Sequence, residues 1–75
     1  MQQDTLKIYT ICYNTSDFPG LYTCRIHEIN GGKVEVGPLM GTGQTLEEVR
    51  KLLPIGVHNI QREPDDDPVI IESWI

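Results

Sequence analysis

The sequence predicts a small α+β domain, in which one short helix packs on one face of an antiparallel sheet of four to five strands. The segment 45–54 is the only one with the apolar spacing and the end signals of a helix. The segments before and after it are rich in β-branched and aromatic residues and are separated by turn residues, as short strands are. The predicted order is β-β-β-α-β-β, in a single domain that covers residues 1–75.

The first two predicted strands cover residues 6–14 and 21–29, and a loop at 15–20 containing Asp, Pro and Gly joins them. Both faces of the first strand are rather apolar, so we expect it to be central in the sheet or covered on both sides. Cys12 and Cys24 lie in these strands. We interpret them as small buried hydrophobic thiols, with a pair of thiols that face each other as the alternative.

A hairpin turn is predicted at Asn30-Gly31-Gly32, because glycine readily adopts the positive φ that tight turns need. A three-residue loop with a bulge places Ile26 opposite Val36. The same loop places His27 opposite Glu35. This register keeps the apolar side chains of the hairpin together. It also predicts a polar sheet face formed by Arg25, His27, Lys33 and Glu35.

The helix is predicted to start after Thr45, a good N-cap, and Glu48 three residues later completes a capping box. One apolar stripe would lie on the sheet, made of Leu46, Val49, Leu52 and Leu53. Pro54 disfavours helical geometry at the residue before it, so we expect the helix to end at Leu53 after about two turns.

The last two predicted strands cover residues 57–61 and 69–75, with an acidic turn at 62–68 between them. The final strand is apolar on both sides, with one side formed by Val69, Ile71 and Ile75 and the other by Ile70, Glu72 and Trp74. A single helix covers only one sheet face, and an exposed apolar face usually marks an interface. We predict an interface that includes Tyr9, Tyr13 and Trp74.

Composition disfavours two classes of partner. Eleven acidic and six basic residues give a net charge of -5, which opposes binding to nucleic-acid phosphates. The longest apolar run, Val69–Ile71, is too short to cross a membrane. The segment Met1–Asp4 lacks the basic and apolar regions of a signal peptide. We therefore expect no nucleic-acid or membrane partner and a cytoplasmic location.

No catalytic residue, metal site or cofactor is predicted. His27 and His58 are the only histidines, and no Ser, Cys or carboxylate stands in a recognisable triad order with them. The consecutive residues Asp65–Asp67 cannot all aim at one metal ion, so we interpret them as solvated turn residues. The candidates for a ligand site are residues of the predicted polar face, namely Arg25, His27 and Glu35.

Two motifs resemble known families. The segments Thr45–Pro54 and Pro64–Ile75 together resemble a group of short bacterial proteins of unknown function, which implies no activity. The segment Gly43–Val49 resembles the strand-to-helix junction of HicB-type antitoxin domains, which are small sheets with a helix that bind a toxin partner. The turn at Asp17–Gly20 lies well upstream of the helix, whereas a similar turn lies just before it in that family.

These observations lead to three hypotheses. The first is a non-enzymatic protein-interaction module that associates with itself, for example as a homodimer, through the open sheet face or an edge. The second is a small enzyme or ligand-binding protein that uses the polar sheet face. The third is a HicB-like antitoxin or regulatory domain.

Overall fold

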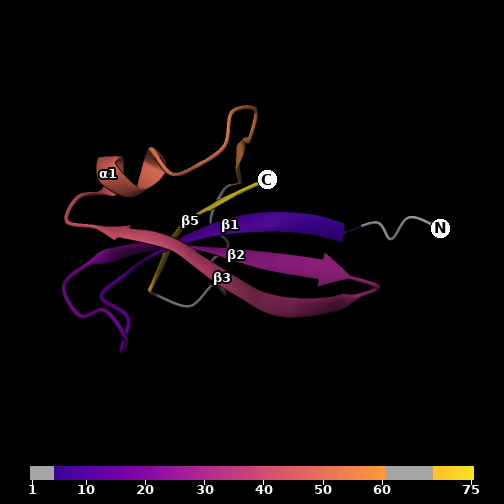
Figure 1. Ribbon diagram of the computed structural model, residues 1–75, viewed down its shortest axis with the longest axis horizontal. Helices are drawn as coiled ribbons and strands as arrows, with labels where there is room; N and C mark the ends of the chain where they lie inside the picture. Colours follow the sequence, from indigo (N-terminus) through magenta and orange to yellow (C-terminus); the bar gives the residue numbers. More distant parts are fainter. Residues whose placement is uncertain (1–4, 61–68) are drawn as a thin grey trace.

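The computed structural model describes residues 5–60 and 69–75, which form a five-stranded antiparallel sheet and one short helix (Figure 1). In space the strands follow the order β3-β2-β1-β5-β4. The α+β class, the element order and the central position of the first strand are confirmed. The predicted acidic turn lies outside the described residues. The elements are β1 (Thr5–Tyr13), β2 (Tyr22–Asn30), β3 (Lys33–Gly43), α1 (Leu46–Arg50), β4 (Asn59–Ile60) and β5 (Ile70–Trp74).

Helix α1 begins where its capping residues predict. The hydroxyl of Thr45 accepts a hydrogen bond from the backbone N–H of Glu48, at 3.3 Å. The carboxylate of Glu48 accepts the N–H of Gln44 at 3.2 Å, one residue earlier than in the predicted capping box. The helix ends at Arg50, before the predicted end at Leu53. The next amides bond to carbonyls three residues back, at 3.0 and 3.1 Å, so the chain tightens into a turn before the proline.

The core lies between α1 and one side of the sheet, here named the helix face. Its fully buried side chains are Ile11 of β1, Cys24 of β2 and Val49 of α1. Around them pack half-buried side chains, which are Tyr9, Tyr22, Met40, Leu46, Leu52, Leu53 and Trp74. Figure 1 shows α1 over one end of the sheet and the β2–β3 turn at the other end. A chain of this size builds only a thin core, since it buries about 60% of its unfolded surface.

The β2–β3 hairpin has a two-residue turn, so the predicted three-residue loop is wrong. The two turn glycines have φ angles of 59° and 84°, a pair of positive values typical of a type I′ turn. As a result Val36 pairs with His27 instead of Ile26, and Glu35 pairs with Glu28. Two bulges interrupt the β2–β3 ladder between Cys24 and His27, and beyond them the pairing continues in a shifted register.

A further bulge lies where β5 pairs with β1, between Ile11 and Cys12. Because of this bulge Ile70 pairs with Cys12, whereas Glu72 pairs with Ile11 on the helix face. Trp74 also lies on the helix face, so the predicted grouping of Ile70 with Glu72 and Trp74 is wrong.

The two cysteines lie on opposite faces of the sheet. Cys12 pairs with Thr23, and Cys24 pairs with Ile11 on the helix face, so the alternative of two facing thiols is wrong. Cys24 is buried as predicted and its thiol contacts the sulfur of Met40 at 3.8 Å, while Cys12 is half-buried. Burial raises the pKa of the Cys24 thiol, and the nearby Cys12 raises it further.

Candidate interaction surface

Beyond the helix, β1, β2 and β3 continue as a three-stranded ribbon, because β5 pairs only with residues Tyr9 to Cys12 of β1. The two sides of this ribbon differ in chemistry. On the helix face the strand register places charged side chains, namely Lys7, Glu28, Lys33 and Glu35. On the opposite side it places a set that we name the open face, made of Leu6, Ile8, His27, Ile29, Val34 and Val36.

The open face is built from two rows of directly paired residues that run across the ribbon. One row is Leu6, Ile29 and Val34, and the other is Ile8, His27 and Val36. Side chains paired in this way contact their neighbours on the adjacent strand. Leu6, Val34 and Val36 are 44%, 66% and 70% exposed. The other three are half-buried. Aliphatic side chains are therefore exposed on the side of the sheet away from α1.

The next row on the same side is more polar, and its polar groups have partners within the chain. It contains Thr10 and Arg25, followed by Leu39 on β3. The Thr10 hydroxyl lies 3.0 Å from Nδ1 of His27. Arg25 Nη1 donates to the carbonyl of Gly37 at 3.4 Å. On the other side of Thr10 the row continues into β5 and β4, so that this side of the sheet extends across all five strands.

The predicted ligand site is only partly assembled. Arg25 and His27 share one side of the sheet, as expected, but Glu35 lies on the other side. The reason is the two-residue turn, which shifts every side chain of the early part of β3 to the opposite face. Burial lowers the pKa of His27, and the positive charge of Arg25 lowers it further, so the imidazole is neutral at pH 7.

The three residues of the predicted interface all lie on the helix face. Tyr9 and Trp74 are cross-strand neighbours that pack against the core. Tyr13 packs against Tyr22, with ring centroids 4.6 Å apart, and is 40% exposed. An interface formed by these aromatic residues stays a prediction.

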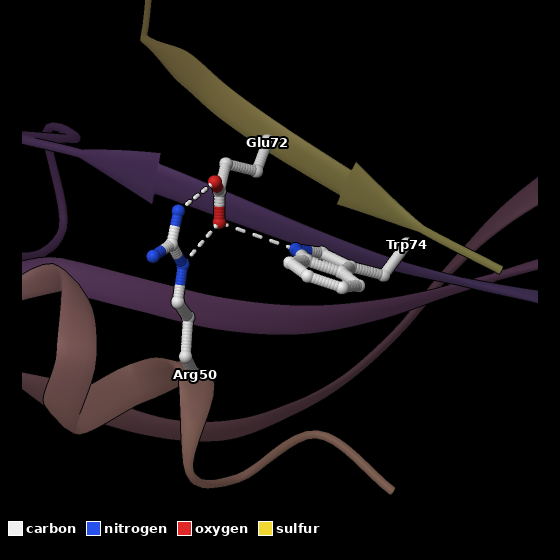
Figure 2. A network of polar contacts seen from close by, with 3 residues as sticks. All are labelled: Arg50, Glu72 and Trp74. Carbon is white, nitrogen blue, oxygen red and sulfur yellow. Dashed lines mark hydrogen bonds and ion pairs between the residues drawn. The ribbon is translucent and has the colours of Figure 1, made fainter. Parts of the chain in front are cut away.

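A polar network that the sequence did not indicate joins α1 to β5 (Figure 2). Arg50 Nε donates to Oε1 of Glu72 at 2.9 Å, and Arg50 Nη2 forms an ion pair with Oε2. The indole N–H of Trp74 donates to the same carboxylate at 3.2 Å. The hydrogen bond from Arg50 lowers the pKa of Glu72, and that from Trp74 contributes in the same direction. The network fixes the helix against the end of the sheet.

These features define a class of protein: a small α+β domain with a five-stranded antiparallel sheet, one short helix on one face, and an aliphatic patch on the ribbon part of the opposite face. Comparison with models of known protein families, with curated proteins and with solved structures gives no match to this chain. Within residues 5–60 and 69–75, we find no pocket and no group of three or more His, Cys, Asp or Glu side chains placed to hold a metal ion. The helix in this part of the chain is neither long enough nor apolar enough to cross a membrane.

Proposed function

We propose that this chain is a non-enzymatic protein-interaction module that associates with a second copy of itself through the open face. The main support is the polarity of the ribbon. Its charged side continues the helix face, and its aliphatic side faces away from the helix. In antiparallel sheets with such alternation, the apolar face is normally packed and the charged face is solvated. Val34 and Val36 remain largely exposed in a single copy, so packing of this face requires another molecule.

The size of the surface fits a weak contact with a second copy. The strand register places fifteen side chains on the same side of the sheet as the open face. The spacing between strands, multiplied by the distance between alternate residues of a strand, gives each side chain about 32 Å² of sheet area. Thr10 and Thr23 are already buried within one copy. This side therefore offers about 400 Å², and two copies would bury about 800 Å², the size of a weak, transient contact. We expect a weak and reversible dimer in which two sheets pack face to face. The positions are Leu6, Ile8, Thr10, Cys12, Thr23, Arg25, His27, Ile29, Val34, Val36, Leu39, Thr42, Ile60, Ile70 and Ser73.

The distribution of charge also favours contact through this side. The net charge of -5 opposes self-association at long range. None of the fifteen positions carries a carboxylate, and Arg25 is the only Arg or Lys among them. Glu28 and Glu35 lie on the other side of the sheet. The negative charges of two copies therefore repel each other through solvent, and not within the contact. Salt screens such repulsion, so association should strengthen as ionic strength rises.

Face-to-face packing is favoured over addition at the edge strand β3. Pro38 lacks the N–H group that a new strand would need, and two bulges interrupt the strand. Natural sheets protect their edges with these same devices. The open face has no such protection, so we assign the interaction to the face.

The test is the substitution Val36→Glu, compared with the control Asn30→Asp. Both add one negative charge, but Val36 lies on the open face and Asn30 on the helix face. Val36 is 70% exposed, so the change should alter monomer stability by no more than about 0.5 kcal/mol. We expect Val36→Glu to raise the dimer Kd by about tenfold or more, because it buries an unpaired carboxylate in the interface.

Sedimentation equilibrium over a concentration series up to about 1 mM measures these constants. A dimer with an association free energy of about 4 kcal/mol has a Kd of about 1 mM, so half of the chains are dimeric at the top of the series. The control should keep the Kd of the parent chain within about threefold, a difference of less than 1 kcal/mol. A parent chain that stays monomeric over the whole series overturns the proposal. Equal weakening by both substitutions also overturns it, because charge alone then explains the effect.

The resemblance to HicB-type antitoxins implies a different partner, a toxin protein. A chain that is monomeric alone but co-purifies with the product of a neighbouring gene would support that reading and contradict self-association. Binding of a small ligand that is lost in His27→Ala would instead support the ligand-binding hypothesis, now without Glu35.

A further inference from the structure

We propose that His27 makes the self-association of this chain dependent on pH, with dimers forming when the imidazole is neutral and separating when it gains a proton. This inference rests on the proposed function and identifies how the same surface is regulated. The geometry that supports it is the position of His27 in the middle of the open face. Ile8 of β1 is its paired neighbour on one side, and Val36 of β3 is its neighbour on the other.

Among the residues that the structure describes, no carboxylate faces His27 to stabilise a positive charge. From β1 it is faced by Ile8 and Thr10, and from β3 by Val36. The Thr10 hydroxyl can hydrogen-bond to Nδ1 of either a neutral or a protonated imidazole, so this bond favours neither protonation state. On β2 itself the next charged group on this side is Arg25, which repels a second positive charge. Among the described residues, the other titratable groups on this side are Cys12, two rows away, and His58, whose backbone pairs with Ile75.

The carboxylates of the ribbon cannot compensate, because they lie on the other side of the sheet. Glu28 and Glu35 are paired with each other there, and Lys7 and Lys33 share that side. A symmetric dimer through the open face brings together two copies of His27 and two of Arg25. Neither copy contributes a carboxylate from the fifteen aligned positions. Burial of an unpaired charge is costly, so the dimer retains the neutral form of His27.

The sign and the steepness of the effect follow from linkage. At acid pH each separated monomer binds one proton on His27, and the dimer binds none. Below the pKa of His27 in the monomer, the dimer Kd therefore rises by up to about 100-fold for each unit that the pH falls. The ordinary pKa of histidine is about 6.5 and that of His27 lies lower, so the effect begins below about pH 6.5. Above that pH the Kd is constant. The general loss of negative charge at acid pH would have the opposite effect, because weaker repulsion between copies would lower the dimer Kd.

The experiment measures the dimer Kd by sedimentation between pH 7.5 and 5.5 for the parent chain, His27→Gln and His58→Gln. Glutamine stays neutral and can still bond to Thr10. His58 is the only other histidine; it is exposed and its backbone pairs with Ile75 at the β4 edge of the sheet, outside the six residues of the open face, so its variant is the control. We expect the parent chain and His58→Gln to lose affinity steeply below about pH 6.5. His27→Gln should lose less than about threefold over the range, as expected without a linked proton.

A second measurement needs no substitution. The ring protons of His27 in the parent chain report its pKa by NMR, and linkage requires that this pKa fall as protein concentration rises. A dimer whose Kd does not change with pH, or a His27→Gln variant as steep as the parent, overturns the switch and leaves the proposed function intact. A parent chain that is monomeric at pH 7.5 overturns both. A His27 pKa that is independent of concentration in a dimerising chain also overturns the switch.

Discussion

At the scale of single residues, Arg50 and Glu72 connect the helix to the last strand. Their two-point contact restrains a helix too short to be stable alone. The Arg50 side chain is 44% exposed, so water screens the pair and its contribution is expected to be about 1 kcal/mol at most.

The contribution of this pair should depend on pH in a defined direction. The folded-state pKa of Glu72 is lowered, so the stabilisation is complete above its unfolded pKa of about 4.3 and is lost as pH falls through the folded pKa. Arg50→Gln should therefore reduce the free energy of unfolding by up to about 1 kcal/mol at pH 7 and by much less in strong acid. Urea unfolding at both pH values measures this. The neighbouring substitution Lys51→Gln is the control, and an equal loss from Arg50→Gln at both pH values would contradict the account.

Residue contacts of this kind are only partly readable from a sequence. The capping of α1 by Thr45 was predicted, because donor and acceptor are three residues apart and local geometry decides the bond. The pairing of Arg50 with Glu72 was not predicted, because the two residues are brought together by a sheet whose register includes a bulge. The same limit explains why Glu35 was placed beside His27, although it lies on the opposite face.

At the scale of elements, two glycines of β3 allow close packing for different reasons. A Cβ atom at Gly37 would lie 2.6 Å from the carbonyl oxygen of Ile26, which belongs to the backbone of β2. A Cβ atom at Gly41 would lie 2.7 Å from the Cδ1 methyl of Leu52, the end of a flexible side chain. The first contact is relieved only if the strands separate, whereas the second is relieved by rotation of a side chain.

We therefore predict that Gly37→Ala destabilises the fold more than Gly41→Ala. Overpacking at a site that cannot relax typically costs about 1–3 kcal/mol, and the cost at Gly41 should fall below that range. Each variant is the control for the other, since both add one methyl group to the same strand. Chemical denaturation monitored by tryptophan fluorescence gives both values, and equal or reversed costs would show that the bulge at Gly37 adapts easily.

The elements themselves follow from the sequence better than their alignment does. Strand-forming segments, turn residues and the start of the helix are local signals, and the structure confirms them. Grouping the apolar residues of β2 and β3 on one face predicts the wrong register for the hairpin. The two-glycine turn was a usable signal for the shorter loop. The bulges opposite Cys24 to His27 leave no pattern in the alternation of side chains, but Gly37 and Pro38 are a local signal for a bulge in this part of β3.

At the scale of the whole molecule, the fold divides its apolar residues between two places. One set forms the thin core beneath α1, and the other forms the open face at the opposite end of the sheet. The sequence predicted an uncovered apolar face, but it assigned aromatic residues to that interface. The structure places Tyr9 and Trp74 against the core and aliphatic side chains on the open face. A dimer through the open face would add the second half of a sandwich core.

The most direct test of self-association through the open face is a set of intermolecular NOEs, measured in a mixture of isotope-labelled and unlabelled chains at pH 7.5. We expect contacts between copies from the methyl groups of Ile8, Ile29, Val34 and Val36, and none from the charged side of the ribbon. Contacts from Tyr13 and Trp74 instead, or from the backbone of β3 alone, would contradict it.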